Sequence, residues 1–312
     1  MAVYVVTGGA GFIGSNIVQH LAEDGQEVRV VDDLSTGHRE NLQSAAGRAR
    51  LFEGSVCDGA LLRRAFDGAD YVLHQAALAS VPRSVADPLA TNRANVEGTL
   101  MVLDAARECG VRRVVYASSS SVYGDAPTLP KREDMTPRPK SPYAVSKLAG
   151  EYYCQVYNGV FGLETVALRY FNVFGPRQDP TSQYAAVIPI FIDCIVSGKR
   201  PKVFGDGEQS RDFTFVDDVV AANLQAARAE GAAGAVCNLG RAERHTLNEL
   251  LELLQQIIGK RVKPQYGPDR AGDVKHSEAD ISRAKQAFGY DPKVSFEDGL
   301  RRTVEWFRGT MV

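Results

Sequence analysis

The chain has 312 residues, and its 36 basic and 38 acidic residues give a formal net charge of −2 with histidine neutral. This balance is not typical of a polyanion-binding protein or an acidic tail, and 44% hydrophobic residues argue against intrinsic disorder. The length is typical of about two domains, or of one large domain with an insertion.

Short apolar, β-branched runs alternate with helical patterns over the first 172 residues. Strands are predicted at Val3–Thr7, Gln26–Asp32, Arg50–Phe52, Tyr71–His74, Arg113–Ser118 and Leu163–Arg169, and helices at Gly11–Asp24, Ala60–Phe66, Asn92–Cys109 and Tyr143–Val160. Continuously apolar strands separated by helices indicate a parallel sheet covered on both faces. The predicted fold class is therefore α/β, with a doubly wound parallel-sheet Rossmann domain.

The alternation loosens beyond Asn172, where several prolines and glycines interrupt the pattern. Helical patterns return at Leu247–Ile258 and Asp298–Phe307, while Phe215–Leu239 again reads as a helix and a strand of the sheet. We therefore predict that residues 1–172 and 215–240 form the Rossmann domain. The discontinuous pieces 173–214 and 241–312 are predicted to form a smaller mixed α/β cap.

A glycine turn joins the first predicted strand to the first predicted helix. Its glycines are spaced G-x-x-G-x-x-G from Gly8, which permits a tight turn and a close approach of backbone N–H groups to a pyrophosphate. Asp32 ends the second predicted strand, where a carboxylate can hold both hydroxyls of an adenosine ribose and repel a 2′-phosphate. The predicted cofactor is NAD, and His38 and Arg39 keep NADP as an alternative.

A tyrosine and a lysine lie four residues apart, at Tyr143 and Lys147, where a helix is predicted to start after Pro142. This spacing places both side chains on one helix face. An ammonium beside a phenol lowers the pKa of the phenol, as a base acting near neutral pH requires. Four serines, 118–121, follow the strand predicted at Arg113–Ser118, and together these residues predict a proton-transfer site.

With these motifs, the chain resembles the extended short-chain dehydrogenase/reductase family, and in particular its nucleotide-sugar 4-epimerases, over essentially its whole length. The motifs are TGGAGFIGS, SSSSVYG, SPYAVSK, LRYFNVFG and FGDGEQSRDF. The resemblance implies that Tyr143 transfers the proton, that Lys147 holds the nicotinamide ribose and tunes the tyrosine, and that Ser119 bonds the 4-oxygen of the sugar. It further implies that tightly held NAD oxidises C4, after which the 4-keto sugar rotates and is reduced on its other face.

Two residues separate epimerisation from related reactions. The 4,6-dehydratases carry Asp-Glu directly after the active-site threonine, whereas this chain has Ser120 and Ser121 there and therefore lacks an acid and a base for elimination. The glutamate that UDP-xylose-forming decarboxylases usually keep in this stretch is also absent. Two further alternatives are a catalytically silent NAD-binding regulator, which the intact Ser119, Tyr143 and Lys147 disfavour, and an oxidoreductase that releases a 4-keto sugar.

The resemblance also implies a set of cofactor contacts. They are Gly8, Gly11, Phe12, Ile13, Gly14, Asp32, Asp33, Ser35, Thr36, Gly37, Ser55, Val56, Gln75, Ala76, Ala77, Asn95, Tyr143, Lys147 and Tyr170. Two of these depart from the usual pattern. Ser55 stands where relatives often have an aspartate, so the contact to the adenine amine is expected to pass to Asp58 or to the backbone. Asp33 replaces a common asparagine and adds negative charge beside the ribose.

The implied substrate contacts come from many segments. They are Ser80, Ser119, Ser120, Ser121, Tyr143, Asn172, Val187, Val203, Phe204, Arg211, Arg270, Asp273 and Ser277. Arg211 and Arg270 match positions that grip the diphosphate of UDP, a task suited to guanidinium groups. Asp273 is expected near the uridine ribose, and Val203 with Phe204 beside the uracil.

The size of one residue bears on the choice of sugar. Ser277 occupies a position where a bulky tyrosine restricts family members to glucose and galactose, so a serine implies room for a 2-acetamido group. We therefore expect interconversion of UDP-GlcNAc and UDP-GalNAc, with UDP-Glc and UDP-Gal also accepted. UDP-glucuronate is an alternative substrate, although its epimerases tend to have threonine where this chain has Asn172.

Other features of the sequence bear on the cellular location and the partners of the protein. The N-terminal residues do not resemble a signal peptide, and the apolar stretch around residues 185–196 is shorter than the roughly 20 residues of a membrane span. Five cysteines without a Cys-x-x-Cys pair favour a reducing compartment. We expect a cytoplasmic protein with no metal, membrane or nucleic-acid partner. The resemblance implies a homodimer formed through the helices predicted at Asn92–Cys109 and Tyr143–Val160.

Overall fold

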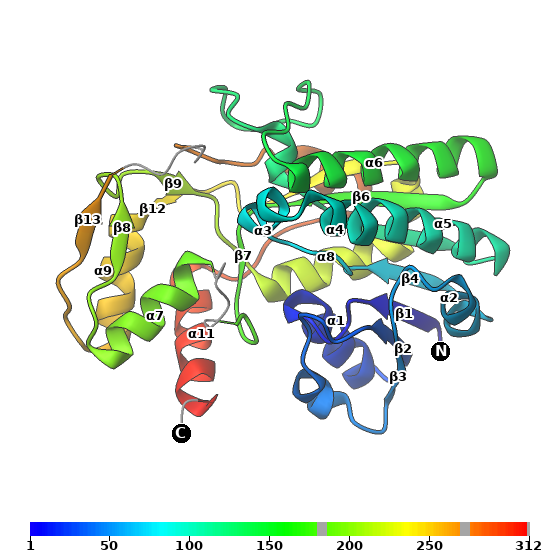
Figure 1. The fold of residues 1–312 in the computed structure, drawn as a ribbon, viewed down its shortest axis with the longest axis horizontal. Helices are drawn as coiled ribbons and strands as arrows, with labels where there is room; N and C mark the ends of the chain where they lie inside the picture. Colours follow the sequence, from blue (N-terminus) through cyan, green and yellow to red (C-terminus); the bar gives the residue numbers. More distant parts are fainter. Residues whose placement is uncertain (180–185, 269–274, 311–312) are drawn as a thin grey trace.

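A seven-stranded parallel sheet forms the larger lobe of the protein (Figure 1). The structure, a computed structural model, describes residues 1–179, 186–268 and 275–310. The strand order is β11-β6-β5-β4-β1-β2-β3. The strands are β1 (Val3–Thr7), β2 (Glu27–Asp32), β3 (Ala49–Glu53), β4 (Tyr71–His74), β5 (Arg113–Ser119), β6 (Glu164–Tyr170) and β11 (Val236–Leu239). Chain order reverses between β1 and β4, so the carboxyl ends of these two strands form the crevice where such sheets bind ligands.

Residues of each strand point alternately into two apolar cores. Tyr4 and Val6 of β1 pack into the first core, and Val5 packs into the second. The first core includes residues of α1 (Phe12–Glu23) and α8 (Val216–Arg228), and the second includes residues of α2 (Gly59–Phe66), α5 (Gly98–Glu108) and α6 (Pro142–Phe161). Helices therefore cover both faces, which confirms the predicted doubly wound fold.

The predicted elements of this lobe agree with the structure to within one or two residues, with one exception. The helix predicted at Asn92–Cys109 is divided into α4 (Pro88–Asn92), a π-helical turn η2 (Arg93–Glu97) and α5. It begins earlier because the Asp87 side chain accepts from Ala90 N and caps α4 ahead of Pro88. The lobe also contains α3 (Val81–Ala86) and the 3₁₀ turns η1 (Arg39–Ala45), η3 (Ser120–Tyr123) and η4 (Glu230–Ala232).

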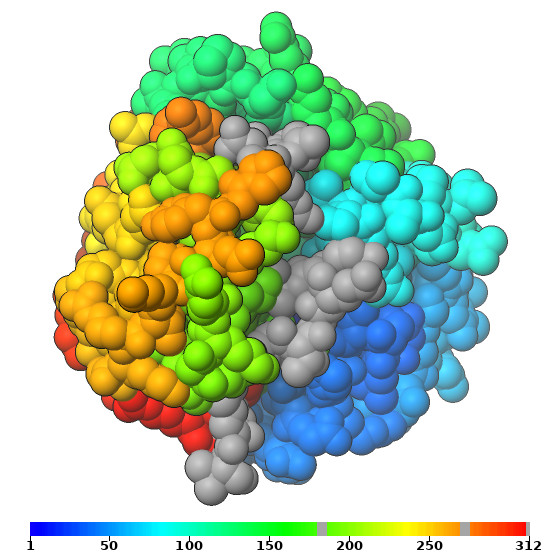
Figure 2. Space-filling view, turned by 60° about the vertical axis from the view of Figure 1, so that its left-hand side comes forward, coloured from blue at the N-terminus to red at the C-terminus, as the bar shows by residue number. Residues whose placement is uncertain are grey.

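Short elements form the smaller lobe on the left of Figure 1. Its helices are α7 (Val187–Ser197), α9 (Leu247–Ile258) and α11 (Phe296–Thr310), whereas α10 (Ser282–Phe288) packs against β11 and α8 of the sheet lobe. Three strand pairs accompany them: β7 (Val173–Phe174) with β10 (Thr214–Phe215), β8 (Lys202–Phe204) with β13 (Gln265–Gly267), and β9 (Ser210–Arg211) with β12 (His245–Thr246). Figure 2 shows lime and orange segments, which are distant in sequence, packed side by side in this lobe.

An aromatic cluster joins the two lobes. The Phe174 ring centroid lies 5.6 Å from that of Phe215 and 5.7 Å from that of Phe296, and the Phe213 and Phe296 rings stack at 5.2 Å. All four side chains are buried in the same core that covers one face of the sheet. Apolar packing is therefore continuous from the sheet into the smaller lobe.

Candidate functional site

The glycine turn lies at the carboxyl end of β1, beside β4. Gly8 has a positive φ of 68°, and a Cβ added there would lie 2.6 Å from Ala76 N. A Cβ at Gly14 would lie 2.1 Å from Gly8 O, so neither position has room for a side chain. Gly11 is the N-cap residue of α1 and offers no side-chain cap, which leaves first-turn N–H groups to bind an anion.

Asp32 is buried at the end of β2, next to the glycine turn. Its Oδ2 accepts a hydrogen bond from Ala10 N at 2.9 Å, and its Oδ1 accepts one from Leu34 N at 2.8 Å. Burial raises the pKa of this carboxyl, and the two backbone hydrogen bonds oppose that rise. A Cβ at Gly37 would lie 3.0 Å from Asp32 Oδ1, so glycine keeps the approach to the carboxylate open.

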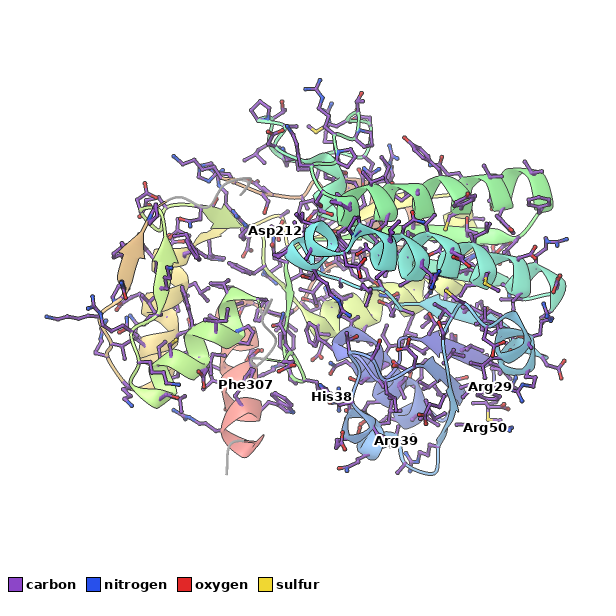
Figure 3. The ribbon with its side chains drawn as sticks, in the orientation of Figure 1. Arg29, His38, Arg39, Arg50, Asp212 and Phe307 are labelled. Atoms are coloured by element: carbon purple, nitrogen blue, oxygen red, sulfur yellow. The ribbon has the colours of Figure 1, made fainter. Side chains whose placement is uncertain are left out.

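Charges around Asp32 bear on the choice between NAD and NADP. Arg39, labelled in Figure 3, forms an ion pair with Glu53 and so has a carboxylate partner already. The Asp33 carboxylate is exposed and accepts from Ser35 N at 3.0 Å. A ribose with free hydroxyls fits these acidic groups better than a 2′-phosphate does. The turn and Asp32 together fit NAD.

The other predicted cofactor residues surround the same edge of the sheet. Phe12 and Ile13 are half-buried at the start of α1, whereas Ser35 and Thr36 are exposed in the loop after β2. Ser55, Val56, Ala76 and Ala77 follow β3 and β4, and the Val56 side chain is buried. The Asp58 carboxylate caps α2 by accepting from Ala60 N and Leu61 N, so it has a structural function besides any adenine contact.

Three further polar side chains form a group among themselves. The Tyr170 hydroxyl lies 3.1 Å from Gln75 Oε1 and accepts from Asn223 Nδ2 at 2.8 Å. Gln75 Nε2 donates to Asn223 Oδ1 at 3.1 Å. Burial raises the pKa of Tyr170, so its hydroxyl remains protonated. Gln75 and Tyr170 were predicted as cofactor contacts, whereas Asn223 was missed because a single asparagine in an amphipathic helix forms no motif.

Ser119, Tyr143 and Lys147 come together where β5 meets the start of α6. Ser141 caps α6 by accepting from Ala144 N at 3.2 Å, and this capped start lies directly before Tyr143. The Ser119 side chain interacts with the Tyr143 phenol and acts to lower its pKa. The Lys147 Nζ donates to Ala117 O at 2.8 Å and lies 5.9 Å from the centroid of the Tyr143 ring. The three residues predicted to carry the chemistry therefore share one site.

A cavity of about 300 Å³ lies in the smaller lobe. Four of the predicted substrate residues line it: Asn172, Val187, Phe204 and Arg211. Arg211 Nη1 donates to Ser210 O at 3.0 Å and to Lys275 O at 3.2 Å. Asn172 Nδ2 donates to Asp212 O at 2.9 Å and to Ser277 Oγ at 3.3 Å, which places Ser277 beside the cavity wall.

Comparison with known proteins identifies the family. A family model described as "NAD dependent epimerase/dehydratase family" matches residues 4–240. The chain belongs to this family. It is also 41% identical over 309 residues to "UDP-glucose 4-epimerase" of Mycolicibacterium smegmatis, with 97% of this chain and 98% of that protein covered. The sequence-based assignment to the extended short-chain dehydrogenase/reductase family is confirmed.

Two solved structures share the whole fold of this family member. The UDP-N-acetylglucosamine 4-epimerase from Methanobrevibacter ruminantium M1, in complex with UDP-N-acetylmuramic acid, has a TM-score of 0.95, 42% identity and 99% coverage of both chains. The UDP-glucose 4-epimerase from Thermotoga maritima, with UDP-glucose, has a TM-score of 0.95, 41% identity, and coverage of 99% of this chain and 100% of that chain. A UDP-glucuronate 4-epimerase from Thermodesulfobacterium geofontis is 35% identical, covering 98% of this chain and 96% of that protein.

One electrostatic prediction for this epimerase/dehydratase family member is wrong. Burial raises the pKa of Tyr143, and the nearby Ser119 side chain opposes the rise. Lys147 does not produce the predicted decrease, because its ammonium donates to Ala117 O rather than to the phenol. Burial lowers the pKa of Lys147 itself to about 7, so this lysine gains and loses a proton near neutral pH.

Several residues predicted to contact a ligand have side chains that are buried or already bonded to other protein groups. The Val203 side chain is fully buried in the core, so only its backbone is available to a ligand. The Ser80 hydroxyl caps α3 by accepting from Arg83 N at 3.2 Å. The Asn95 amide is bonded to Leu78 and Ser146. Ser120 is half-buried, and Ser121 Oγ is buried without a hydrogen-bond partner. Arg270 and Asp273 lie outside the described residues.

Asp212 is a second residue that the sequence did not identify (Figure 3). It is fully buried, and its carboxylate accepts from the backbone N–H groups of Arg241 at 2.7 Å, Ala242 at 3.1 Å and Ala279 at 3.0 Å. Burial raises its pKa to about 6. Asp212 follows Arg211 directly and joins three segments of the smaller lobe, including the one that carries Ser277.

Within residues 1–179, 186–268 and 275–310, no group of three or more His, Cys, Asp or Glu side chains is arranged to hold a metal ion. Over the same ranges no helix has the length and apolar character required to cross a bilayer.

Proposed function

We propose that this protein is an NAD-dependent UDP-hexose 4-epimerase. Its expected substrates are the UDP-GlcNAc/UDP-GalNAc pair and the UDP-Glc/UDP-Gal pair, which differ within each pair only in configuration at C4. The observation that carries the proposal is the convergence of Ser119, Tyr143 and Lys147 beside a turn that fits NAD. Ser120 and Ser121 offer no acid and base for elimination, so C4 inversion is the reaction best supported.

The chain's own side chains supply proton transfer and orientation. Tyr143 takes the proton from O4 of the sugar during oxidation and returns it during reduction. Ser119, whose side chain interacts with Tyr143, orients O4 toward the phenol. With a pKa of about 7, Lys147 gains and loses a proton near neutral pH, and its Nζ lies 5.9 Å from the centroid of the Tyr143 ring. When bound, NAD supplies the redox centre for C4.

The cofactor assignments follow from the sheet lobe. We propose that the turn at Gly8 and Gly14 receives the pyrophosphate and that Asp32 binds the adenosine ribose hydroxyls. The remaining predicted cofactor residues are proposed as neighbours along the same edge. Gln75, Asn95 and Tyr170 act mainly by shaping the site, because their polar groups bond other protein groups.

The substrate assignments follow from the smaller lobe, which we propose as a cap made of residues 173–214 and 241–312. Arg211 supplies the positive charge that a diphosphate requires, and Phe204 offers an apolar face for the base. Ser277 touches Asn172 at the cavity wall, and its small side chain supports acceptance of a 2-acetamido group. Arg270 and Asp273 remain proposed contacts to the diphosphate and the uridine ribose.

Product analysis tests the function. Purified protein is incubated in parallel with UDP-GlcNAc, UDP-Glc and UDP-glucuronate, and the nucleotide sugars are separated by chromatography. UDP-GalNAc and UDP-Gal are expected. Conversion of UDP-glucuronate alone would select the alternative substrate, and stoichiometric accumulation of reduced nicotinamide would indicate an oxidoreductase. Absence of all turnover in a protein that retains NAD would indicate the binding-only alternative.

Tyr143→Phe provides the decisive variant. It keeps the ring and removes the hydroxyl, so we expect kcat to fall by about 10²-fold to 10⁴-fold while bound NAD is retained. The measurement is turnover together with the nicotinamide content of the purified protein. Unchanged turnover in Tyr143→Phe would contradict the assigned proton-transfer role.

We propose that the enzyme is a cytoplasmic homodimer. The cysteines that the structure describes are free thiols, in keeping with a reducing compartment. On α6, Val145, Tyr152, Val156 and Val160 are 47–70% exposed, and their spacing places them along one helix face. Light scattering should give a dimer for wild type and a monomer for Val156→Asp. Tyr266→Asp, which removes an equally exposed apolar side chain on β13, should remain dimeric.

A further inference from the structure

A buried hydrogen-bond chain starts at Thr7, the last residue of β1 before the glycine turn. Thr7 Oγ1 lies 2.6 Å from His74 Nδ1, and His74 Nε2 lies 2.9 Å from Thr99 Oγ1. His74 ends β4, and Thr99 belongs to α5. All three side chains are buried. The imidazole therefore links the two central strands to a helix at the crevice between β1 and β4.

Each hydrogen bond in this series determines which atom donates and which accepts in the bond before it. The Thr99 hydroxyl donates its single hydrogen to Asn95 O at 2.6 Å. His74 Nε2–H must therefore donate to Thr99, and Nδ1 must accept from the Thr7 hydroxyl. This arrangement requires a neutral ring. Burial and the nearby Lys147 ammonium lower the pKa of His74 to about 3, which keeps the ring neutral.

The chain continues from the π-helical turn to α6. Asn95, in η2, donates through Nδ2 to Ser146 Oγ at 3.0 Å, and Ser146 Oγ donates to Tyr143 O at 2.8 Å. Asn95 and Ser146 are both buried. The chain thus begins beside Gly8 of the cofactor turn and ends on the backbone of Tyr143.

We propose that His74 is a positioning residue that sets the spacing between the cofactor turn and the Tyr143 helix through this chain. The proposal rests on the proposed epimerase function. The proposal follows from the two ends of the hydrogen-bond chain. One end lies at the turn that fits NAD, and the other lies at the proton-transfer residue. Because buried polar groups left unpaired are costly, the chain favours a single arrangement of both ends. Small misplacements of reacting groups strongly reduce rates.

Thr99→Val tests the central link with little change in side-chain volume. It leaves the His74 ring in place and removes the acceptor of Nε2–H. Thr303→Val is a matched control, because Thr303 is also buried and its hydroxyl also donates to the carbonyl four residues earlier, at 2.6 Å, in α11. Tyr116→Phe is included because the Tyr116 hydroxyl, which donates to Lys147 O at 3.4 Å, also interacts with Thr99. For each variant, kcat, KM, NAD content and Tm are measured.

Thr99→Val is expected to lower kcat about tenfold, with KM for the UDP-sugar changed less than twofold. Thr303→Val is expected to lower Tm by a similar amount while kcat stays within twofold of wild type. Equal kcat values in Thr99→Val and Thr303→Val would overturn the inference, as would a loss of kcat fully reproduced by Tyr116→Phe.

A double variant distinguishes one connected chain from separate local effects. Ser146→Ala removes the last side-chain link to Tyr143. If the links act as a unit, Thr99→Val combined with Ser146→Ala should have a kcat no lower than that of the worse single variant. Losses that multiply would overturn the inference. Wild-type protein without epimerase turnover would instead overturn the proposed function, so the two failures are distinguishable.

Discussion

The two lobes hold their ligand-facing residues in different ways. In the sheet lobe, Asp32, Asn95 and Tyr170 are each bonded to protein groups that fix their orientation. On the substrate side, Asn172 donates to the backbone carbonyl of Asp212 and Arg211 donates to that of Lys275, so each is held by a segment distant in sequence. The cofactor-facing residues are thus held by hydrogen bonds within and beside one sheet. The substrate-facing residues are held where separate segments of the polypeptide meet, around Asp212.

This difference predicts which lobe loses more stability when a buried polar group is removed. Removing a partner inside a packed sheet leaves a group that no water can reach, whereas the smaller lobe has short strands and an adjoining cavity of about 300 Å³. The largest losses of stability are therefore expected beneath the proton-transfer site.

The buried ion pair between Arg169 and Glu151 provides the strongest test. Arg169 donates to the two Glu151 oxygens at 2.9 and 2.8 Å, Ser118 also bonds Glu151, and both charged side chains are at most 5% exposed. Glu151→Gln leaves the Arg169 charge uncompensated, so the free energy of unfolding should fall by about 3–5 kcal/mol. Urea denaturation measures it.

The control for this variant is a charge pair on the surface. Glu297 pairs with Arg301 on α11, and both side chains are more than half exposed. Glu297→Gln should cost less than about 1 kcal/mol. Similar losses in the two variants would mean that burial beneath the site does not determine the cost, and the contrast between the lobes would lose its basis.

Sequence patterns predict the sheet lobe well because its signals are local. Strands such as Val3–Thr7 are continuous apolar runs, and the glycine turn, Tyr143 and Lys147 each belong to short motifs. The π-helical turn η2 has no comparable local signal, and its Asn95 bonds Ser146, 51 residues away in α6. The sequence indicates His74 only as the end of a strand, because its hydrogen-bond partners are 67 and 25 residues away.

The smaller lobe is less predictable for the same reason. Its strands are two or three residues long and exist because distant segments pair, as β9 does with β12. A two-residue strand has no readable period. Asp212 carries no local sign of its three backbone donors, and the sequence indicates the α7 region only as an apolar stretch. Its substrate residues came from family resemblance rather than from pattern.

Asp212→Asn probes the smaller lobe and should have an intermediate effect. The amide NH₂ replaces one acceptor, so at least one backbone N–H from Arg241, Ala242 or Ala279 loses its partner. We expect a loss of about 1–3 kcal/mol in the free energy of unfolding. Because Arg211 and Ser277 lie on the joined segments, KM for the UDP-sugar should rise several-fold while kcat changes less than twofold.

An exposed aspartate provides the matched control for Asp212→Asn. Asp87 accepts from Ala90 N at 2.9 Å as a helix cap on the surface, and asparagine caps helices equally well. Asp87→Asn should change the free energy of unfolding by less than about 0.5 kcal/mol. A larger fall in kcat than rise in KM for Asp212→Asn would place this residue with the proton-transfer site rather than with substrate binding.

The stability of the sheet lobe should also depend on pH, through His74. His74 stays neutral in the folded protein because burial lowers its pKa to about 3, whereas in the unfolded chain it titrates near its ordinary value of 6.5. As the pH falls below about 6.5, the unfolded chain binds a proton that the folded protein does not, so stability is lost on acidification. His74→Gln keeps a planar acceptor and an N–H donor but cannot titrate.

Between pH 7.5 and pH 5, wild type should therefore lose about 2 kcal/mol more of its free energy of unfolding than His74→Gln loses. Urea denaturation at the two pH values measures the difference, and titrating groups common to both proteins cancel. His20→Gln, at a half-exposed histidine on α1, should retain the acid sensitivity of wild type. Equal losses in wild type and His74→Gln would mean that His74 accepts a proton in the folded state. That outcome would contradict the assigned bonds, because a ring that donates to Thr99 and accepts from Thr7 has no free nitrogen for a second proton.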